Sequence, residues 1–149
     1  MTPFLLDTSV LIHWTRDSRQ AQAIDATFNL SASRLRPLIC AVTLGEMQAF
    51  SQSLNWGPSK KARLQQLTRQ LVVVDILDAR VLDAYAALQT LAQSRGWALF
   101  NHKNDLWIAA AAKATSSHLL TMDHDFLPLR GEASWTVTVL DATTGMPLP

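Results

Sequence analysis

The chain of 149 residues has little of several features that would mark a special class of protein. Its single cysteine, Cys40, cannot form an internal disulfide, which favours a reducing compartment and predicts a small buried side chain. The formal net charge is only +1, so nucleic-acid binding would need local basic patches. Apolar runs fall well short of the ~20 residues of a membrane span, and no basic leader opens the sequence. We therefore expect a soluble, cytoplasmic protein.

What the sequence does contain is enough apolar material for one sizeable core. Hydrophobic residues make up 48% and charged residues 17%, which is the balance of a folded globular domain. No internal repeat, low-complexity segment or linker divides the chain. We expect residues 1–149 to form a single domain, with a loose tail from about residue 142.

Short apolar segments alternate with amphipathic ones along the chain. Strands are predicted at residues 4–6, 37–42, 71–76, 118–122 and 135–140. Helices are predicted at residues 7–14, 19–30, 43–54, 58–71, 78–96 and 104–114. On the longest helix, the expected buried stripe is Val81, Leu82, Tyr85, Leu88 and Leu91, and the expected stop is Gly96. This alternation indicates an α/β fold whose central, mostly parallel sheet of about five strands is covered on both faces.

Acidic residues stand at the ends of these strands. Asp7 directly follows the first strand, and Asp123 and Asp125 follow the fourth. Glu46 is expected in the first turn of the helix after the second strand. Ligands of such sheets bind beyond the carboxyl ends of the strands, so these acids should share one crevice. Asp105, in the first turn of the last predicted helix, joins them only if that helix begins at the same edge.

Each acid also has an explanation that involves no function. The stretch TLGE fits a capping box in which Thr43 caps a helix and Glu46 accepts the Thr43 N–H. Asp105 suits the positive end of a helix dipole, and the other acids suit cap and turn positions. Separate caps have no reason to meet in one crevice, so their convergence would favour function.

Converging carboxylates would have a chemical consequence. Within about 4–6 Å of one another they raise each other's pKa unless a cation is bound. Oxygen ligands select hard ions such as Mg²⁺ or Mn²⁺, whereas the four histidines show no paired spacing typical of zinc ligands. Such ions activate water and stabilise the transition state of phosphodiester hydrolysis. The acids therefore predict a metal-dependent phosphodiesterase.

Four motifs, in order, resemble those of PIN-domain ribonucleases, and especially of the VapC toxins of prokaryotic toxin–antitoxin pairs: LLDTSVLI, TLGEM, NDLWIAAAA and LLTMDHDF. The resemblance spans Phe4 to about Leu140. It implies a three-layer α/β/α sandwich and Mg²⁺- or Mn²⁺-dependent endonucleolytic cleavage of RNA, leaving 3′-hydroxyl and 5′-phosphate ends. Family toxins cut tRNA or ribosomal RNA. It also implies a homodimer and a cognate VapB-type antitoxin.

The resemblance also assigns roles to residues. The acidic quartet that would hold metal and carry catalysis falls on Asp7, Glu46, Asp105 and Asp123. Asp125 would be an auxiliary acid, either near the metal or capping the next turn. Supporting hydroxyls fall on Thr8 and Thr121, and Ser9 stands where many relatives have asparagine.

An acidic site that takes in RNA needs positive charge at its rim. Lys60, Lys61 and Arg63 stand together at the head of one predicted helix, and Lys103 stands beside the Asp105 motif. These four are candidates to contact phosphates. A solvated helix face explains the first three equally well.

Two other functions compete with the ribonuclease hypothesis. A catalytically silent PIN-like module would bind RNA or protein, but such modules usually lack one or more of the acids present here. A phosphatase of the haloacid dehalogenase type could use LLDTS as its nucleophile strand. That chemistry normally needs a second aspartate two residues on, where this chain has Ser9.

Overall fold

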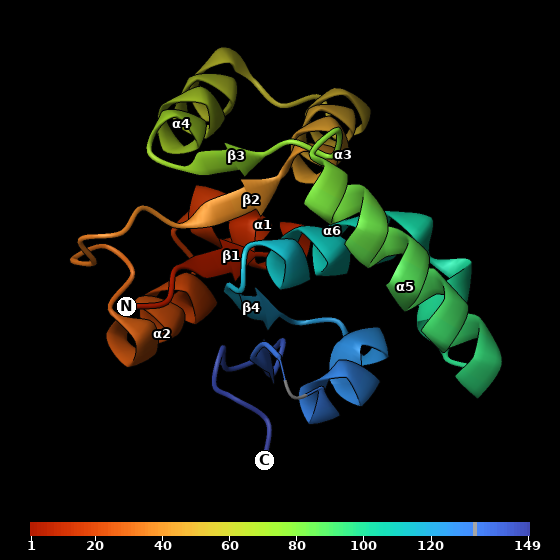
Figure 1. Ribbon diagram of the computed structural model, residues 1–149. Coiled ribbons are helices and arrows are strands. Elements are labelled where there is room, and N and C mark those ends of the chain that lie inside the picture. The colour runs from red at the N-terminus through yellow and green to blue at the C-terminus, as the bar shows by residue number, and fades with distance from the viewer. Residues whose placement is uncertain (133) are drawn as a thin grey trace.

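A single parallel sheet organises the computed structural model, which describes residues 1–132 and 134–149. The strands lie in the order β3-β2-β1-β4-β5, and each neighbouring pair is parallel. All carboxyl ends therefore point to the same edge, toward the right in Figure 1. The strands are β1 (Phe4–Leu6), β2 (Leu38–Cys40), β3 (Val72–Val74), β4 (His118–Thr121) and β5 (Val137–Val139).

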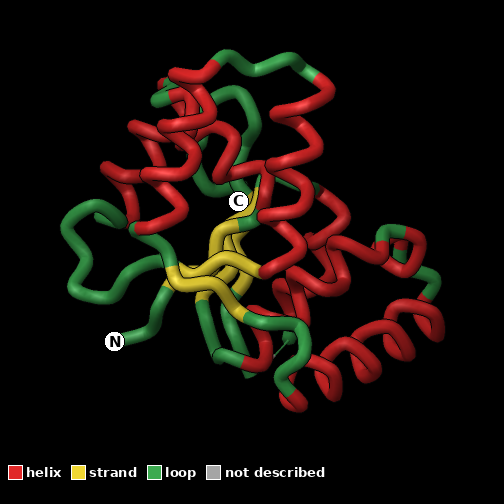
Figure 2. Tube along the Cα trace, turned by 90° about the horizontal axis from the view of Figure 1, so that it is seen from above, coloured by secondary structure: helices red, strands yellow, loops and turns green. Residues whose placement is uncertain are grey.

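Helices cover both faces of this sheet, which lies at the centre of the molecule in Figure 2. None of the described helices combines the length and apolarity needed to cross a bilayer. The helices are α1 (Thr8–Arg16), α2 (Arg19–Phe28), α3 (Ala41–Ser53), α4 (Pro58–Arg69), α5 (Ala79–Arg95) and α6 (Lys103–Ala114), with 3₁₀ segments η1 (Ala98–Asn101) and η2 (His124–Gly131).

Alternate residues of the central strands enter two separate cores. Leu5 and Leu119 pack with α5 and α6 on one face, whereas Leu6 and Leu120 pack with α1 on the other. This is the period-2 alternation of a strand buried on both sides. The predicted three-layer α/β/α sandwich with a five-stranded sheet is confirmed, and the sheet is parallel throughout the described residues.

The helix hairpin of α5 and α6 is held by small residues and a left-handed cap. Ala109, Ala110, Ala111 and Ala112 are all fully buried, so α6 approaches the sheet and α5 closely. Gly96 ends α5 with φ of 65°, as expected from the sequence, because glycine adopts this conformation without strain. Between α5 and α6 lies η1. The turn from α5 is thus short enough to place the start of α6 beside the carboxyl ends of the strands.

The capping box predicted at Thr43 and Glu46 is wrong. Helix α3 begins at Ala41, directly after β2, and Cys40 is its N-cap with no side-chain capping bond. Thr43 consequently lies inside the helix, and Glu46 lies past the first turn rather than in it. The helix starts early because Cys40 leaves the strand in an extended conformation that already suits an N-cap. The Cys40 side chain is fully buried, as the sequence predicts.

Two further expectations fail at the surface. Leu82, predicted on the buried stripe of α5, is 44% exposed, and the fully covered positions are Val81 and Leu88 with alanines between and after them. The tail is not loose but folds back on β5, where the Leu148 N–H donates to the Val139 carbonyl at 2.8 Å. Leu140 and Pro147 form an antiparallel bridge in the same turn. The pattern of apolar residues alone reveals neither the exposure of Leu82 nor the contact of the tail with β5.

Candidate metal and catalytic centre

Asp7 is the most buried carboxylate of the sheet edge, at 4% exposure. It follows β1 and caps α1, and its backbone N–H donates to the Leu120 carbonyl of β4 at 3.0 Å. Its Oδ1 accepts the Thr8 N–H at 2.8 Å. The N-cap position expected as a non-functional alternative is therefore real. It also aims the second carboxylate oxygen toward β4.

Two hydroxyl groups hold that second oxygen. Asp7 Oδ2 accepts hydrogen bonds from Thr121 Oγ1 at 2.7 Å and Ser9 Oγ at 3.0 Å. Ser9 Oγ in turn accepts the Met122 N–H at 3.1 Å. Ser9 thus joins the end of β1 to the end of β4, a supporting role that its departure from the family pattern had left open.

A third hydroxyl orients Glu46. Thr8 Oγ1 donates to Glu46 Oε1 at 2.7 Å and lies 3.0 Å from the hydroxyl of Thr43. Thr43 is fully buried and Thr8 nearly so. Sequence reasoning missed Thr43 as a supporting residue because its spacing to Glu46 fitted a helix cap. Inside α3, that same spacing of three residues places the two side chains on one face of the helix, toward Thr8.

Asp105 and Asp123 complete the edge. Helix α6 begins at this edge, so Asp105 in its first turn faces the strand ends. Burial, together with the negative charges of Asp7, Asp123, Glu46 and Asp125, raises the pKa of Asp105 to about 7. The other four acids therefore lie close enough to Asp105 for their charges to act on its carboxylate.

The turn after β4 fixes the orientation of Asp123. Its N–H donates to Thr121 Oγ1 at 3.0 Å, so one hydroxyl serves both Asp7 and the fourth acid. Its own Oδ1 accepts the Asp125 N–H at 2.9 Å and caps η2. Asp125 itself lies in the first turn of η2, and its Oδ2 lies 3.3 Å from His102 Nε2.

The charge of the centre fits a hard divalent cation. Within the part of the chain that the structure describes, no lysine or arginine forms an ion pair with any of these five acids. The pKa of Asp7 is raised to about 6. Burial is the main cause and the charge of Glu46 adds to it, whereas three hydrogen bonds act in the opposite direction. Such a concentration of oxygen ligands without a fixed positive side chain is what Mg²⁺ or Mn²⁺ would satisfy.

A family model for the PIN domain matches residues 4–131. The chain belongs to the PIN domain family. This match contradicts the haloacid dehalogenase alternative, because the fold is that of the PIN domain. Ser9, which stands where that alternative needs an aspartate, donates a hydrogen bond to Asp7. A search among curated proteins finds no match.

Solved structures of similar fold come from several bacteria. VapBC2 from Rickettsia felis, bound to a DNA fragment from the promoter, aligns with a TM-score of 0.74 and 20% identity over 90% of this chain and 96% of that one. VapBC-1 from nontypeable Haemophilus influenzae gives a TM-score of 0.68 with 17% identity over 91% and 96%. FitAcB from Neisseria gonorrhoeae gives 0.64 with 25% identity over 90% and 95%.

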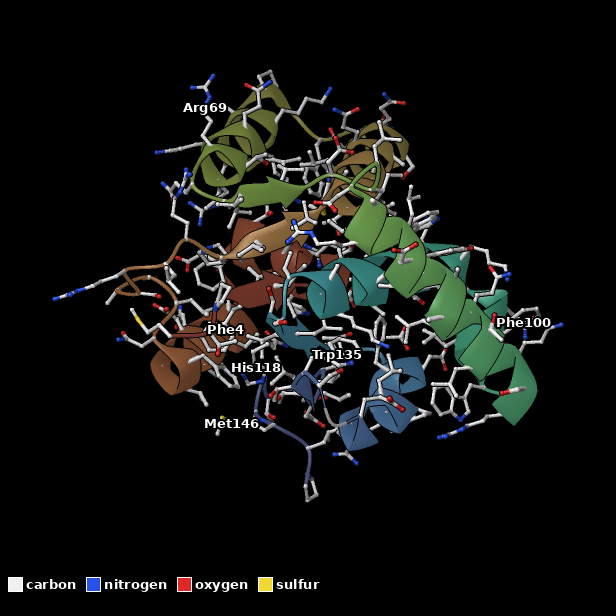
Figure 3. All side chains as sticks on the ribbon, in the orientation of Figure 1. Phe4, Arg69, Phe100, His118, Trp135 and Met146 are labelled. Carbon is white, nitrogen blue, oxygen red and sulfur yellow. The ribbon has the colours of Figure 1, made fainter. Side chains whose placement is uncertain are left out.

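One histidine of this PIN domain lies at the edge of the centre. A nitrogen of His102 and oxygens of Asp105 and Asp125 all fall within 4.8 Å of one another. Spacing along the sequence could not show this closeness, because it depends on how η2 packs against the start of α6. His118 lies elsewhere, at the amino end of β4 beside Phe4 (Figure 3).

Arg63, a candidate for RNA binding, is engaged inside the fold. Its Nε donates to the Thr15 carbonyl at 2.8 Å, and its Nη2 lies 3.5 Å from the Trp14 carbonyl. The Thr15 carbonyl lies in the last turn of α1, where carbonyl groups lack a helical partner, whereas the Trp14 carbonyl also accepts the Asp17 N–H at 3.2 Å. The role of Arg63 in contacting phosphate stays a prediction, and its role in joining α4 to α1 is observed.

The three candidate lysines lie differently. Lys103 Nζ donates to the Phe100 carbonyl at 2.7 Å and lies 3.9 Å from the centre of the Phe100 ring. Phe100 lies on the side of the molecule toward which the strands point (Figure 3). Lys60 Nζ lies 4.5 Å from the centre of the Trp56 ring. Lys61 makes no hydrogen bond or ion pair with another described residue. Of the three lysines, Lys103 is the one that lies close in sequence to an acid of the centre, Asp105.

Proposed function

We propose that this PIN domain is a Mg²⁺- or Mn²⁺-dependent endoribonuclease and the toxin of a toxin–antitoxin pair. The observation that carries the proposal is the meeting of carboxylates from β1, α3, α6 and the turn after β4 at one sheet edge. These segments are far apart in the sequence. Helix capping alone does not explain why Glu46 bonds to Thr8 rather than to a helix N–H.

Asp7, Glu46, Asp105 and Asp123 would hold the divalent ion, with Asp125 at the margin. The ion would supply activated water and positive charge for the phosphodiester transition state. The hydroxyls of Thr121 and Ser9 fix the Asp7 carboxylate, and the Thr8 hydroxyl fixes Glu46. Because these donors are already placed, the oxygens need little reorganisation when a cation and a phosphate group arrive.

Support for the toxin role comes from the similar structures. Several are complexes of a toxin with its antitoxin, including one from Klebsiella pneumoniae whose chain is 98% covered. By analogy, we propose a cognate VapB-type antitoxin, a homodimer and a cytoplasmic location for this chain. Its substrate would be RNA, with tRNA or ribosomal RNA as the first classes to test, cut to 3′-hydroxyl and 5′-phosphate ends.

The silent-module alternative has little support in the site. A binding module needs no set of converging carboxylates whose ionised forms repel one another and, in the case of Asp7, are buried. Retaining them costs stability. Hydroxyl groups that orient these acids add to the argument, since they fix the geometry of the oxygens.

Incubation of purified chain with total RNA tests the proposal. We expect cleavage with Mn²⁺ or Mg²⁺ and none with chelator or with Asp7→Asn, and sequencing of the fragments should show 5′-phosphate ends. Co-purification of a small protein encoded next to this chain would test the toxin role separately. If Mn²⁺ neither raises the melting temperature nor permits cleavage of any RNA, the proposal is wrong.

A further inference from the structure

We propose that His102 is a nitrogen ligand for a divalent transition-metal ion, in a second metal position that shares Asp105 with the acidic centre and is completed by Asp125. This inference rests on the proposed metal-dependent function and adds to it. The position lies at the outer margin of the centre, where the η1–α6 junction meets η2.

The three side chains come from two segments that pack together. His102 is the N-cap residue of α6, Asp105 lies in the first turn of α6, and Asp125 lies in the first turn of η2. One ligand atom from each falls within 4.8 Å of the other two. Ligands on opposite sides of an ion with bonds of about 2.1 Å are about 4.2 Å apart. Small side-chain rotations would therefore bring all three atoms onto one ion.

The backbone already holds two of these ligands in place. The His102 N–H donates to the Leu99 carbonyl at 3.0 Å, and the His102 carbonyl accepts the Leu106 N–H at 3.1 Å. The Asp125 N–H is held by Asp123 Oδ1 at 2.9 Å. Only side-chain rotation remains free, so little ordering is needed for binding.

A surface ion pair does not account for this arrangement. His102 Nε2 lies 3.3 Å from Asp125 Oδ2, but the two side chains are 54% and 32% exposed. Pairs with this exposure stabilise a fold by little, because solvent screens them. The same exposure gives an ion a path from solvent to the ligands.

Asp105 is the carboxylate placed to serve both positions. Charges of Asp7 and Glu46 on the inner side and of Asp125 on the outer side all act on it. A carboxylate has two oxygens and can bind two ions at once. Imidazole favours transition metals, whereas Mg²⁺ demands oxygen ligands. The outer position should therefore take Mn²⁺ in preference to Mg²⁺.

Pulsed electron paramagnetic resonance of the metal-stripped, full-length protein loaded with two equivalents of Mn²⁺ tests this. Directly bound imidazole couples its ¹⁴N nucleus to the Mn²⁺ electron spin. We expect ¹⁴N coupling in the unaltered protein, loss of it in His102→Gln, and retention in His124→Gln, a matched change next to Asp125 in the chain. Calorimetry should show that the affinity for the more weakly bound Mn²⁺ ion falls at least about tenfold in His102→Gln. Loss of a residue that only supports a ligand already costs about that much. Mg²⁺ affinity should stay unchanged.

The outcomes separate this inference from the proposed function. Tight Mn²⁺ binding without ¹⁴N coupling, or coupling that persists in His102→Gln, would overturn the role of His102 and leave the acidic centre intact. Absence of Mn²⁺ binding altogether would overturn both. Thermal melts in chelator should show His102→Gln folded like the unaltered protein, because the side chain is exposed.

Discussion

At the scale of single residues, the carboxylates of the centre are held by short hydroxyl side chains. Thr8, Ser9 and Thr121 each donate to an acid, and Thr121 also accepts the N–H of Asp123. Acids and hydroxyls should therefore respond differently to substitution. Under the proposed function, loss of an acid would remove a metal ligand, whereas loss of a hydroxyl would leave the ligand present but less well oriented.

Glu46→Gln removes a charge and keeps the shape. Glutamine still offers an oxygen to the Thr8 hydroxyl, so the free energy of unfolding should change by less than about 1 kcal/mol. RNA cleavage should fall by more than the about 10–100-fold that loss of an outer-shell partner costs. Cleavage assays beside urea denaturation measure both. Glu132→Gln is the matched control and should cleave normally; normal cleavage by Glu46→Gln would contradict the role of Glu46.

Thr121→Val should affect both stability and metal binding. Thr121 is fully buried, and valine of similar shape would leave the Asp123 N–H without its partner. The cost should be about 1–3 kcal/mol of unfolding free energy and about 10–100-fold in Mn²⁺ affinity. Denaturation and calorimetry measure these quantities. Thr121→Ser keeps the hydroxyl and should restore Mn²⁺ affinity; if it does not, the lost methyl group rather than the hydrogen bonds would be responsible.

The metal-free protein should lose stability as pH rises from about 4 to 7. Burial raises the pKa of Asp7 from 3.8 to about 6, and the pKa of Asp105 rises to about 7, so the folded state binds more protons than the unfolded state in this range. For Asp7 the two-unit shift corresponds to about 3 kcal/mol. Denaturation in chelator at pH 5 and 7.5 measures the change. Asp7→Asn should reduce the pH dependence and leave the part due to Asp105, and Mn²⁺ should restore stability at pH 7.5; a stability that increases with pH would contradict this account.

At the scale of elements, α4 is basic on its surface but tied to α1 through one of its cations. Arg63→Met removes the hydrogen bonds to the last turn of α1 and should cost about 1 kcal/mol of unfolding free energy. Lys61→Met should change stability by less than about 0.5 kcal/mol. If either residue contacts phosphate, its loss should weaken RNA binding and reduce the salt dependence. Urea denaturation and binding assays at two salt concentrations separate these roles.

Most elements could be predicted because local chemistry and tertiary packing agree. The apolar runs became strands, Pro58 began α4, and Gly96 ended α5. The start of α3 was missed because TLGE fits a capping pattern, although the helix has already begun at Ala41 and TLGE lies inside it. Exposure of Leu82 was missed because the helical period places it beside the buried stripe, and only packing against α6 decides which side is covered.

At the scale of the whole molecule, the acidic centre could be predicted from topology. A parallel sheet sends the ends of β1, β2 and β4 to one edge, so Asp7, Asp123 and the helix carrying Glu46 meet there. His102 could not be predicted in this way. Its place depends on the contact between the α5–α6 turn and η2, which no strand order specifies. The ordered tail was missed for a similar reason, since its partner is the edge of β5.

Removal of residues 146–149 should expose that edge. The Leu148 N–H would no longer reach Val139, and the bridge between Leu140 and Pro147 would be lost. An unpaired strand edge pairs readily with other chains. We expect a lower melting temperature and more association in light scattering. A truncated protein that stays as stable and monodisperse as the full chain would show that the tail is dispensable.

The central place of β1 also governs when the protein can act. Phe4–Leu6 lies between β2 and β4, and Asp7 depends on Thr121 and the Leu120 carbonyl for its setting. During translation β1 therefore lacks its β4 neighbour until the segment through Asp123 has left the ribosome. A nascent polypeptide cut short before that segment carries Asp7 and Glu46 but no assembled centre, so under the proposed function incomplete translation products of this chain should not cleave RNA.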